Sequence, residues 1–205
     1  MRQEDKAHRS IEETQLSKRV TVDDYKQFEK HADKQAIAAF IVERFDERYF
    51  NPVMNSSSKH GFTMMAVGCL VIETLESFRQ GWLDTDNSGK KQEEKVYPFN
   101  KFFQQPSELS AFNAISVEFY KNIRCGILHQ SEARGGWRIR RSGVLLDLEN
   151  KTINAELFIQ ALRNAVVEYA CQLQTDPDLW ENLKKKMKQV CENCERDSAV
   201  VPKKP

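Results

Sequence analysis

Two residues near the middle of the chain, Arg124 and His129, have side chains that could carry out phosphate chemistry. Arginine is a permanent cation, and its planar fork of donors suits phosphate oxygens. Histidine exchanges a proton near neutral pH and can act as a general acid or base. Such a pair could stabilise a phosphorane and move protons during RNA cleavage without a metal ion. The structural alternative is an arginine that caps a helix C-terminus, followed by a histidine in the turn.

The residues before this pair predict a helix that begins after Pro106, with Ser107 as its N-cap. Apolar side chains recur at spacings of three and four and form one core-facing stripe: Phe112, Ile115, Phe119 and Ile123. Five residues of a regular helix turn about 500°, which leaves Arg124 and His129 about 140° apart. Their side chains converge only if the helix tightens or ends between them. Gly126 is placed for such a change, because glycine tolerates unusual backbone angles.

An all-helical chain with the pattern Arg-x4-His at the end of a helix resembles the HEPN superfamily (higher eukaryotes and prokaryotes nucleotide-binding). The resemblance implies a helical bundle, and a homodimer that brings two Arg–His pairs into one cleft. It also implies a metal-independent endoribonuclease, a hydrolase that acts as a toxin or in antiviral (anti-phage) defence. Arg124 and His129 match the motif. The residue after the arginine is usually Asn, Asp or His, and here it is Cys125. This departure favours the alternative of a non-catalytic module that binds RNA, nucleotide or a protein partner.

Further residues around the pair complete the candidate site. Tyr120 lies one helical turn before Arg124 and could orient either partner. Cys125 and Gln130 each directly follow a motif residue and are assigned to the same site.

A second predicted helix, residues 62–80, is apolar nearly all round and belongs at the centre of a bundle. Glu73 and Glu76 are its polar exceptions, and a carboxylate on a buried helix needs a hydrogen-bonded or charged partner. One hypothesis is that Glu73 reaches Arg124 and holds its guanidinium in place. The other is that both glutamates lie on a narrow exposed strip.

A small β-hairpin is predicted directly after the motif. Residues 137–140 alternate apolar and basic side chains, residues 144–148 form a second strand, and residues 141–143 make the turn. The hairpin concentrates basic side chains near the candidate site: Arg134, Arg138, Arg140 and Arg141. These arginines either bind the phosphate backbone of RNA or pair with Asp147 and Glu149 as ordinary surface charge.

Between the two predicted helices lies a polar loop, residues 82–95, followed by an aromatic segment, residues 97–103. Residues 84–89 superficially resemble a calcium loop but lack its spacing and its closing glutamate, so we interpret them as a solvated loop. The aromatic segment is expected to pack against the core as a short helix. Stacking on RNA bases is the alternative for these rings.

The apolar periodicity predicts an all-α bundle of about five helices in one HEPN-like domain, residues 21–196. Residues 21–24 form a capping box that begins its first helix. A flexible N-terminal arm, residues 1–20, and a disordered tail, residues 197–205, are expected to flank it because both are polar.

Composition limits the classes of function. The formal net charge is only +1, so a nucleic-acid site must be a local patch. The longest apolar run, residues 64–72, is too short to span a membrane, and no apolar signal region is seen at the N-terminus, which favours a cytoplasmic protein. Cys191 and Cys194 form a lone C-x-x-C that we assign to a helix stripe, so neither a metal nor a cofactor is expected. RNA is the expected partner, and the resemblance adds a second copy and an antitoxin or regulatory protein.

Overall fold

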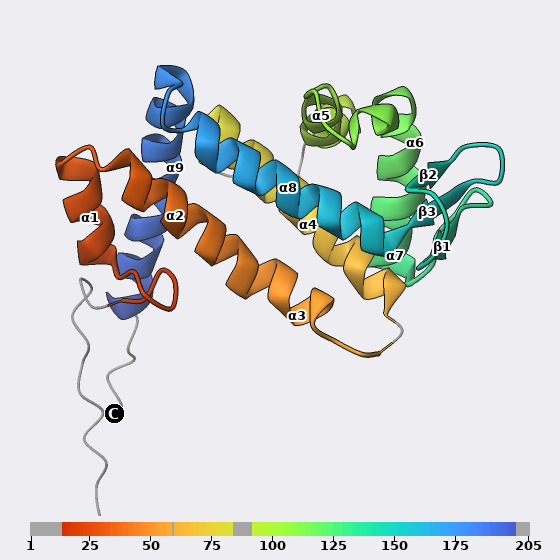
Figure 1. Cartoon of the computed structure of the whole chain (residues 1–205), viewed down its shortest axis with the longest axis horizontal. Helices are drawn as coiled ribbons and strands as arrows, with labels where there is room; N and C mark the ends of the chain where they lie inside the picture. Colours follow the sequence, from red (N-terminus) through yellow and green to blue (C-terminus); the bar gives the residue numbers. More distant parts are fainter. Residues whose placement is uncertain (1–13, 59, 84–91, 200–205) are drawn as a thin grey trace, which may run out of the picture.

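The computed structural model describes residues 14–58, 60–83 and 92–199. The chain is mostly helical and carries a small sheet, which confirms the expected all-α bundle with a β insertion. Figure 1 shows an elongated molecule with α1 and α9 at one end and the strands at the other. The long helices and the shorter α1 and α3 have the following bounds: α1 Val22–Lys30, α2 Lys34–Phe45, α3 Asn51–Met54, α4 Gly61–Gln80, α5 Gln92–Phe103, α8 Ala155–Gln172 and α9 Pro177–Ala199.

Helix α4 lies at the centre of the bundle, as its all-round apolar sequence predicted, and it packs against α5, α8 and α9. Gly68 lets α8 approach closely, because a Cβ there would lie 2.8 Å from the ring of Phe158. By length and composition alone α4 could cross a membrane, yet most of it is buried inside the protein. A core helix of a soluble protein has these properties, and the fold fits that description.

The aromatic segment forms the second half of α5 and confirms the expected packing. The Phe103 ring stacks on Phe112 at 5.3 Å, and the Phe119 ring lies 5.3 Å from Phe103 and 5.6 Å from Phe158. Helix α5 begins at Gln92, within the stretch predicted to be loop. The calcium-like residues 84–89 lie outside the described residues.

The predicted motif helix is not one regular α-helix. Its turns are η3 Ser110–Ile115 (3₁₀), α6 Ser116–Glu118, η4 Phe119–Arg124 (π) and α7 Cys125–Gln130. The Ser107 hydroxyl accepts a hydrogen bond from the backbone of Leu109 at 3.2 Å, before the helical turns begin. The aromatic cluster fixes the first half of this segment, and the contact of α7 with α4 fixes the second.

The predicted hairpin is wrong, although the β insertion exists. Strands β1 Arg138–Arg140 and β2 Leu146–Asp147 do not pair with each other, because β3 Thr152–Asn154 lies between them. β3 runs parallel to β1 and antiparallel to β2. Its Ile153 is fully buried, so the strand joins the sheet to the helical core. Asn154 then begins α8, since its side chain accepts hydrogen bonds from the backbone of Glu156 and Leu157.

Residues 14–20 differ from the expected flexible arm. Leu16 and Val20 are buried, and the Glu43 and Glu47 carboxylates accept hydrogen bonds from backbone N–H groups of this segment. Residues 1–13 lie outside the described residues. At the other end, residues 197–199 of the expected tail continue α9, and residues 200–205 lie outside the described residues.

Candidate functional site

Arg124 and His129 lie side by side on the surface. The Arg124 Nη1 atom is 3.4 Å from His129 Nε2. A guanidinium only donates hydrogen bonds, so a hydrogen bond in this contact requires Nε2 to be the acceptor.

The convergence has a different origin from the one the sequence suggested. The helix neither tightens nor ends between the two residues: the π turn η4 Phe119–Arg124 comes before the pair, and α7 continues regularly to Gln130. The long arginine side chain itself spans the angular gap and brings Nη1 to His129. Such π turns occur often at functional sites. Gly126 does not supply an unusual backbone angle. A Cβ at this position would clash with the backbone oxygen of Glu132, so Gly126 admits the returning chain against α7.

Glu73 fixes the guanidinium from behind. Its Oε1 accepts a hydrogen bond from Arg124 Nε at 3.0 Å, and the two side chains are 10 % and 14 % exposed. The predicted contact between Glu73 and Arg124 is confirmed, and the exposed-strip alternative is wrong for both glutamates, since Glu76 is fully buried. Burial opposes the charge of Arg124, but the adjacent carboxylate outweighs it, so the pKa of the guanidinium is raised. Arg124 is thereby a fixed, permanent cation.

Tyr120 completes the support. The guanidinium carbon of Arg124 lies 5.5 Å from the centre of the Tyr120 ring, within cation–π range. Burial, together with a hydrogen bond to Cys125, raises the pKa of Tyr120 to about 12, so its hydroxyl stays protonated at neutral pH. We call the group formed by Glu73, Arg124 and Tyr120 the motif cluster. Cys125 therefore touches the cluster, whereas Gln130 lies exposed at the end of α7 beside His129.

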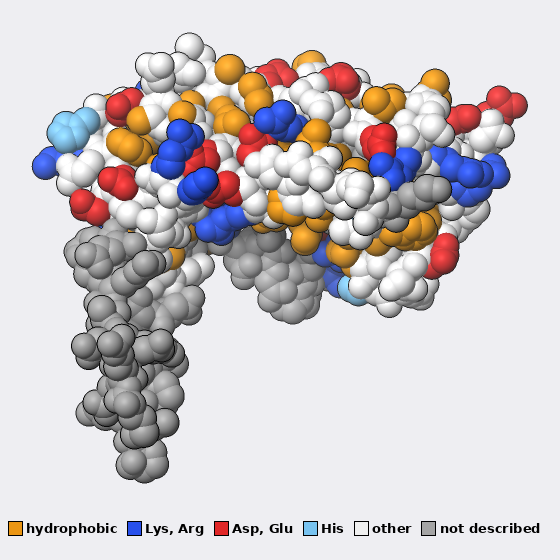
Figure 2. Space-filling view, turned by 60° about the horizontal axis from the view of Figure 1, so that its bottom comes forward, with side chains coloured by type: hydrophobic (Ala, Val, Ile, Leu, Met, Phe, Trp, Pro, Cys, Tyr) orange, Lys and Arg blue, Asp and Glu red, His pale blue; other side chains and the backbone are white. Residues whose placement is uncertain are grey.

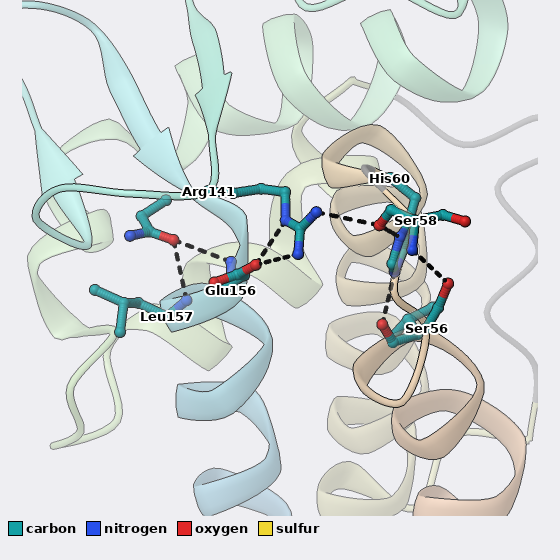
Figure 3. A network of polar contacts seen from close by, with 8 residues as sticks. Ser56, Ser58, His60, Arg141, Glu156 and Leu157 are labelled. Carbon is teal, nitrogen blue, oxygen red and sulfur yellow. Dashed lines mark hydrogen bonds and ion pairs between the residues drawn. The ribbon is translucent and has the colours of Figure 1, made fainter.

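The four predicted RNA-binding arginines divide into two kinds. Arg141 binds Glu156 at 2.6 Å and the carbonyl oxygen of Ser58 at 3.1 Å, and so clamps the β insertion to α8 and to the segment before α4 (Figure 3). Arg134 donates to the backbone oxygen of Lys121 beneath the motif helix.

The other two arginines lie on β1 with their side chains exposed. Arg138 donates one hydrogen bond to the backbone oxygen of Asn150 at 3.0 Å, not to the predicted Asp147 or Glu149. Arg140 is exposed on the same strand. Figure 2 shows Lys and Arg side chains at the end of the molecule where the β insertion lies. Of the predicted cluster, Arg138 and Arg140 are the side chains most accessible to RNA.

A second group of the same residue types lies deeper along α4. Glu76 and Arg79 are buried, and the Arg79 guanidinium carbon lies 5.1 Å from the ring centre of Tyr169. Glu76 accepts a hydrogen bond from Gln80 at 2.8 Å. Among the described residues, Glu76 Oε2, Arg79 Nε and the Tyr169 hydroxyl have no hydrogen-bond partner. We call Glu76, Arg79 and Tyr169 the inner cluster. Of these residues the sequence pointed only to Glu76. Arg79, three residues later on the same helix, could have indicated the rest.

A groove of about 470 Å³ lies elsewhere, between α1 and α9. Its lining alternates lysines with glutamates and contains neither Arg124 nor His129. This mixed charge gives no preference for a ligand of one sign, and we do not assign the groove to the site.

No family model, curated protein or solved structure matches this chain.

Proposed function

We propose that this chain is a metal-independent endoribonuclease of the HEPN type. The observation that carries the proposal is the contact of Arg124 with His129 at 3.4 Å, with Glu73 and Tyr120 holding the arginine. A fixed cation beside an exposed histidine provides charge stabilisation and proton transfer at one point on the surface.

The proposed reaction is an internal transfer at the phosphodiester. His129 takes the proton from the ribose 2′-hydroxyl, and the 2′-oxygen forms a bond to phosphorus. The bond from phosphorus to the 5′-oxygen breaks, and that oxygen takes up a proton. Arg124 stabilises the extra negative charge of the phosphorane. The products are a 2′,3′-cyclic phosphate and a 5′-hydroxyl, and no other reactant is consumed.

This reaction requires both a base and an acid, and each chain offers one His129. A homodimer that joins two sites would supply both groups. Exposed apolar side chains on α4 and α7, namely Phe62, Leu70 and Leu128, give such a partner an apolar surface to cover. The HEPN resemblance supplies the same expectation, together with a cytoplasmic toxin or anti-phage role and an antitoxin or regulatory protein as a further partner.

A non-catalytic module that binds RNA, nucleotide or protein is the second candidate. Cys125 favours it, because this thiol occupies the position where the resembled family usually has a polar residue, and here it bonds to Tyr120. In that case Arg124 and the exposed β1 arginines would bind phosphate without turnover.

The test is cleavage of a mixed RNA pool in EDTA by the wild-type protein and by His129→Ala, with circular dichroism as the check on folding. We expect the wild type to produce 2′,3′-cyclic phosphate ends and the variant to lose about 10²–10⁴-fold in rate. His31→Ala is the matched control, because His31 is an exposed histidine at the end of α1 that bonds only locally, to the Gln27 carbonyl. Equal cleavage by His129→Ala and the wild type would disprove the proposed mechanism. RNA binding without cleavage would favour the second candidate.

A further inference from the structure

Two aromatic rings face each other where α4 ends and α5 passes it. The Trp82 and Tyr97 ring centres are 5.7 Å apart, with the planes tilted by 40°. Tyr97 is 44 % exposed and Trp82 is half-buried. Most rings of the α5 segment have the opposite environment, since Phe99, Phe102 and Phe103 are at most 2 % exposed. Tyr97 is therefore a ring that the core does not use.

Lysines flank this ring pair. The Lys101 ammonium lies 5.5 Å from the centre of the Tyr97 ring, one helical turn further along α5. Lys186 of α9 donates to the backbone oxygen of Leu83, the residue after Trp82, at 3.1 Å. Accessible aromatic faces beside cations are what proteins use to bind single-stranded nucleic acid, because every base has a face that can stack.

The ring pair is connected to the motif cluster through α4. Glu73, Ser77 and Gln80 recur at spacings of three and four, so they share one face of the helix. Glu73 holds Arg124 at one end of this face, and Trp82 follows two residues after its other end. At 1.5 Å per residue, Glu73 and Gln80 lie roughly 10 Å apart along the axis. Glu73 and Ser77 are buried, so this face sets the separation of the two sites along α4 and is not itself a path for RNA.

The turn that presents Trp82 is built by a glycine. Gly81 has φ +64°, and the backbone N–H of Trp82 bonds to the Ser77 carbonyl at 3.0 Å. This left-handed cap ends α4 and directs the chain sideways. A Cβ at Gly81 would lie 3.0 Å from the side chain of Asn182, so the cap is also packed against α9. The position of Trp82 is therefore fixed by the fold.

We propose that Trp82 and Tyr97, with Lys101 beside them, form a base-stacking subsite for single-stranded RNA. An unpaired base stacks on the exposed aromatic face, and Lys101 binds an adjacent phosphate. This proposal rests on the proposed function for the class of ligand and specifies it further, because duplex RNA has no free base to offer. The subsite binds RNA that flanks the phosphodiester held at Arg124.

The first experiment uses tryptophan fluorescence of the full-length His129→Ala protein, titrated with an eight-nucleotide single-stranded RNA and with a duplex of the same length. The other two tryptophans, Trp137 and Trp180, are 4 % and 8 % exposed, so the signal of a stacked base comes from Trp82. We expect saturable quenching by the single strand and little by the duplex. Absence of quenching, or equal quenching by the duplex, would overturn the proposal.

The second experiment measures affinity by anisotropy of labelled RNA. We expect Tyr97→Leu and Trp82→Leu to weaken binding about ten-fold each, and Trp82→Phe to retain most of it. Lys101→Ala should lower the salt dependence by about one phosphate contact. Tyr49→Leu is the control, because it also removes a tyrosine that contacts a neighbouring ring, that of Phe45, in another part of the fold.

The outcomes separate this proposal from the proposed function. Unchanged affinity in Tyr97→Leu and in folded Trp82→Leu disproves the subsite, even if RNA is still cleaved. Stacking that is lost in these variants supports the subsite, even if the wild type cleaves no RNA. If Trp82→Leu does not fold, Tyr97→Leu and Lys101→Ala still decide the test, because unchanged affinity in the first and unchanged salt dependence in the second would disprove the subsite.

Discussion

The two Glu–Arg–Tyr groups on α4 use the same residue types in opposite environments. In the motif cluster, Glu73 and Arg124 form an ion pair that opens to the surface beside His129. In the inner cluster, Glu76 and Arg79 are enclosed, and each has a polar atom without a partner among the described residues. A tyrosine ring lies next to the arginine in both.

The difference shows what makes such a group useful for chemistry. Glu76 and Arg79 bind Gln80 and Gln172 instead of forming an ion pair with each other, so little direct attraction offsets their desolvation. The inner cluster therefore has a structural role at most, as a specific contact between α4 and α8. The motif cluster incurs less desolvation and presents a fixed cation to the surface. Access and a neighbouring histidine, rather than residue type, distinguish the two.

Arg79→Met should give the largest change in stability. It leaves the Glu76 carboxylate buried without the nearby cation, which we expect to cost about 3 kcal/mol in the free energy of unfolding. Urea denaturation at pH 7 measures this. The double variant Glu76→Leu/Arg79→Met should recover most of the loss, since apolar side chains can replace two buried charges. RNA cleavage by the folded protein should stay at the wild-type level, and a specific loss of activity would remove the distinction between the clusters.

Glu73→Gln should change the rate of RNA cleavage rather than the fold. Without the carboxylate the guanidinium of Arg124 is held less firmly, and a displacement of about 1 Å at such a site costs up to about 100-fold in rate. We expect a 10- to 100-fold loss in kcat with KM changed less. Glu73→Asp, which keeps the charge on a shorter arm, should restore part of the rate. A cleavage rate unaffected by Glu73→Gln would argue against a positioning role.

Glu76→Gln should alter the pH dependence of stability. Burial raises the pKa of Glu76 in the folded state, although Gln80 opposes the shift. A raised folded pKa means that the stabilising contribution is fully present below the unfolded pKa and is lost as the pH rises through the folded pKa. The free energy of unfolding of the variant should therefore rise relative to that of the wild type as the pH increases over this window. Urea unfolding from pH 4 to pH 8 gives the comparison, and parallel curves would contradict the shift.

Tyr169→Phe should have the smallest effect. It removes a buried hydroxyl that has no hydrogen-bond partner among the described residues and keeps the ring beside Arg79. We expect a change within about 0.5 kcal/mol, or slight stabilisation, by thermal unfolding. The matched change Tyr120→Phe removes a hydroxyl that interacts with the Cys125 thiol and is not among the unpartnered buried atoms, so it should destabilise more. The reverse order would show that the two tyrosine environments had been assigned the wrong way round.

Much of the motif cluster could be predicted from the sequence, because a charged residue on a buried helix must have a charged or hydrogen-bonded partner. An apolar helix with a glutamate requires a partner for it, and Arg124 was the candidate that the structure confirms for Glu73. The inner cluster was harder to predict, since Tyr169 comes from a helix some ninety residues away in the chain. No local pattern reports such a contact.

The β insertion and the π turn escaped prediction for a related reason. Strand β3 has three residues and runs straight into α8, so its apolar pattern merges with that of the helix. The parallel pairing of β1 with β3 depends on burying Ile153, which is a property of the assembled core. The π turn likewise depends on tertiary packing, because the residues before it lie in the aromatic cluster and α7 after it packs against α4.

The π turn η4 changes the helical phase between the aromatic residues before it and helix α7 after it. Its i→i+5 hydrogen bonds enclose one more residue than those of an α-helix. The aromatic residues before it can therefore keep their alignment with α5 while α7 is rotated into place against α4. Deleting one residue of the π turn before Arg124 would rotate Arg124 and His129 together by about 100° relative to α4, and would take Arg124 away from Glu73. The contact of Arg124 with Glu73 is thus encoded in the length of this segment as much as in the identity of the two residues.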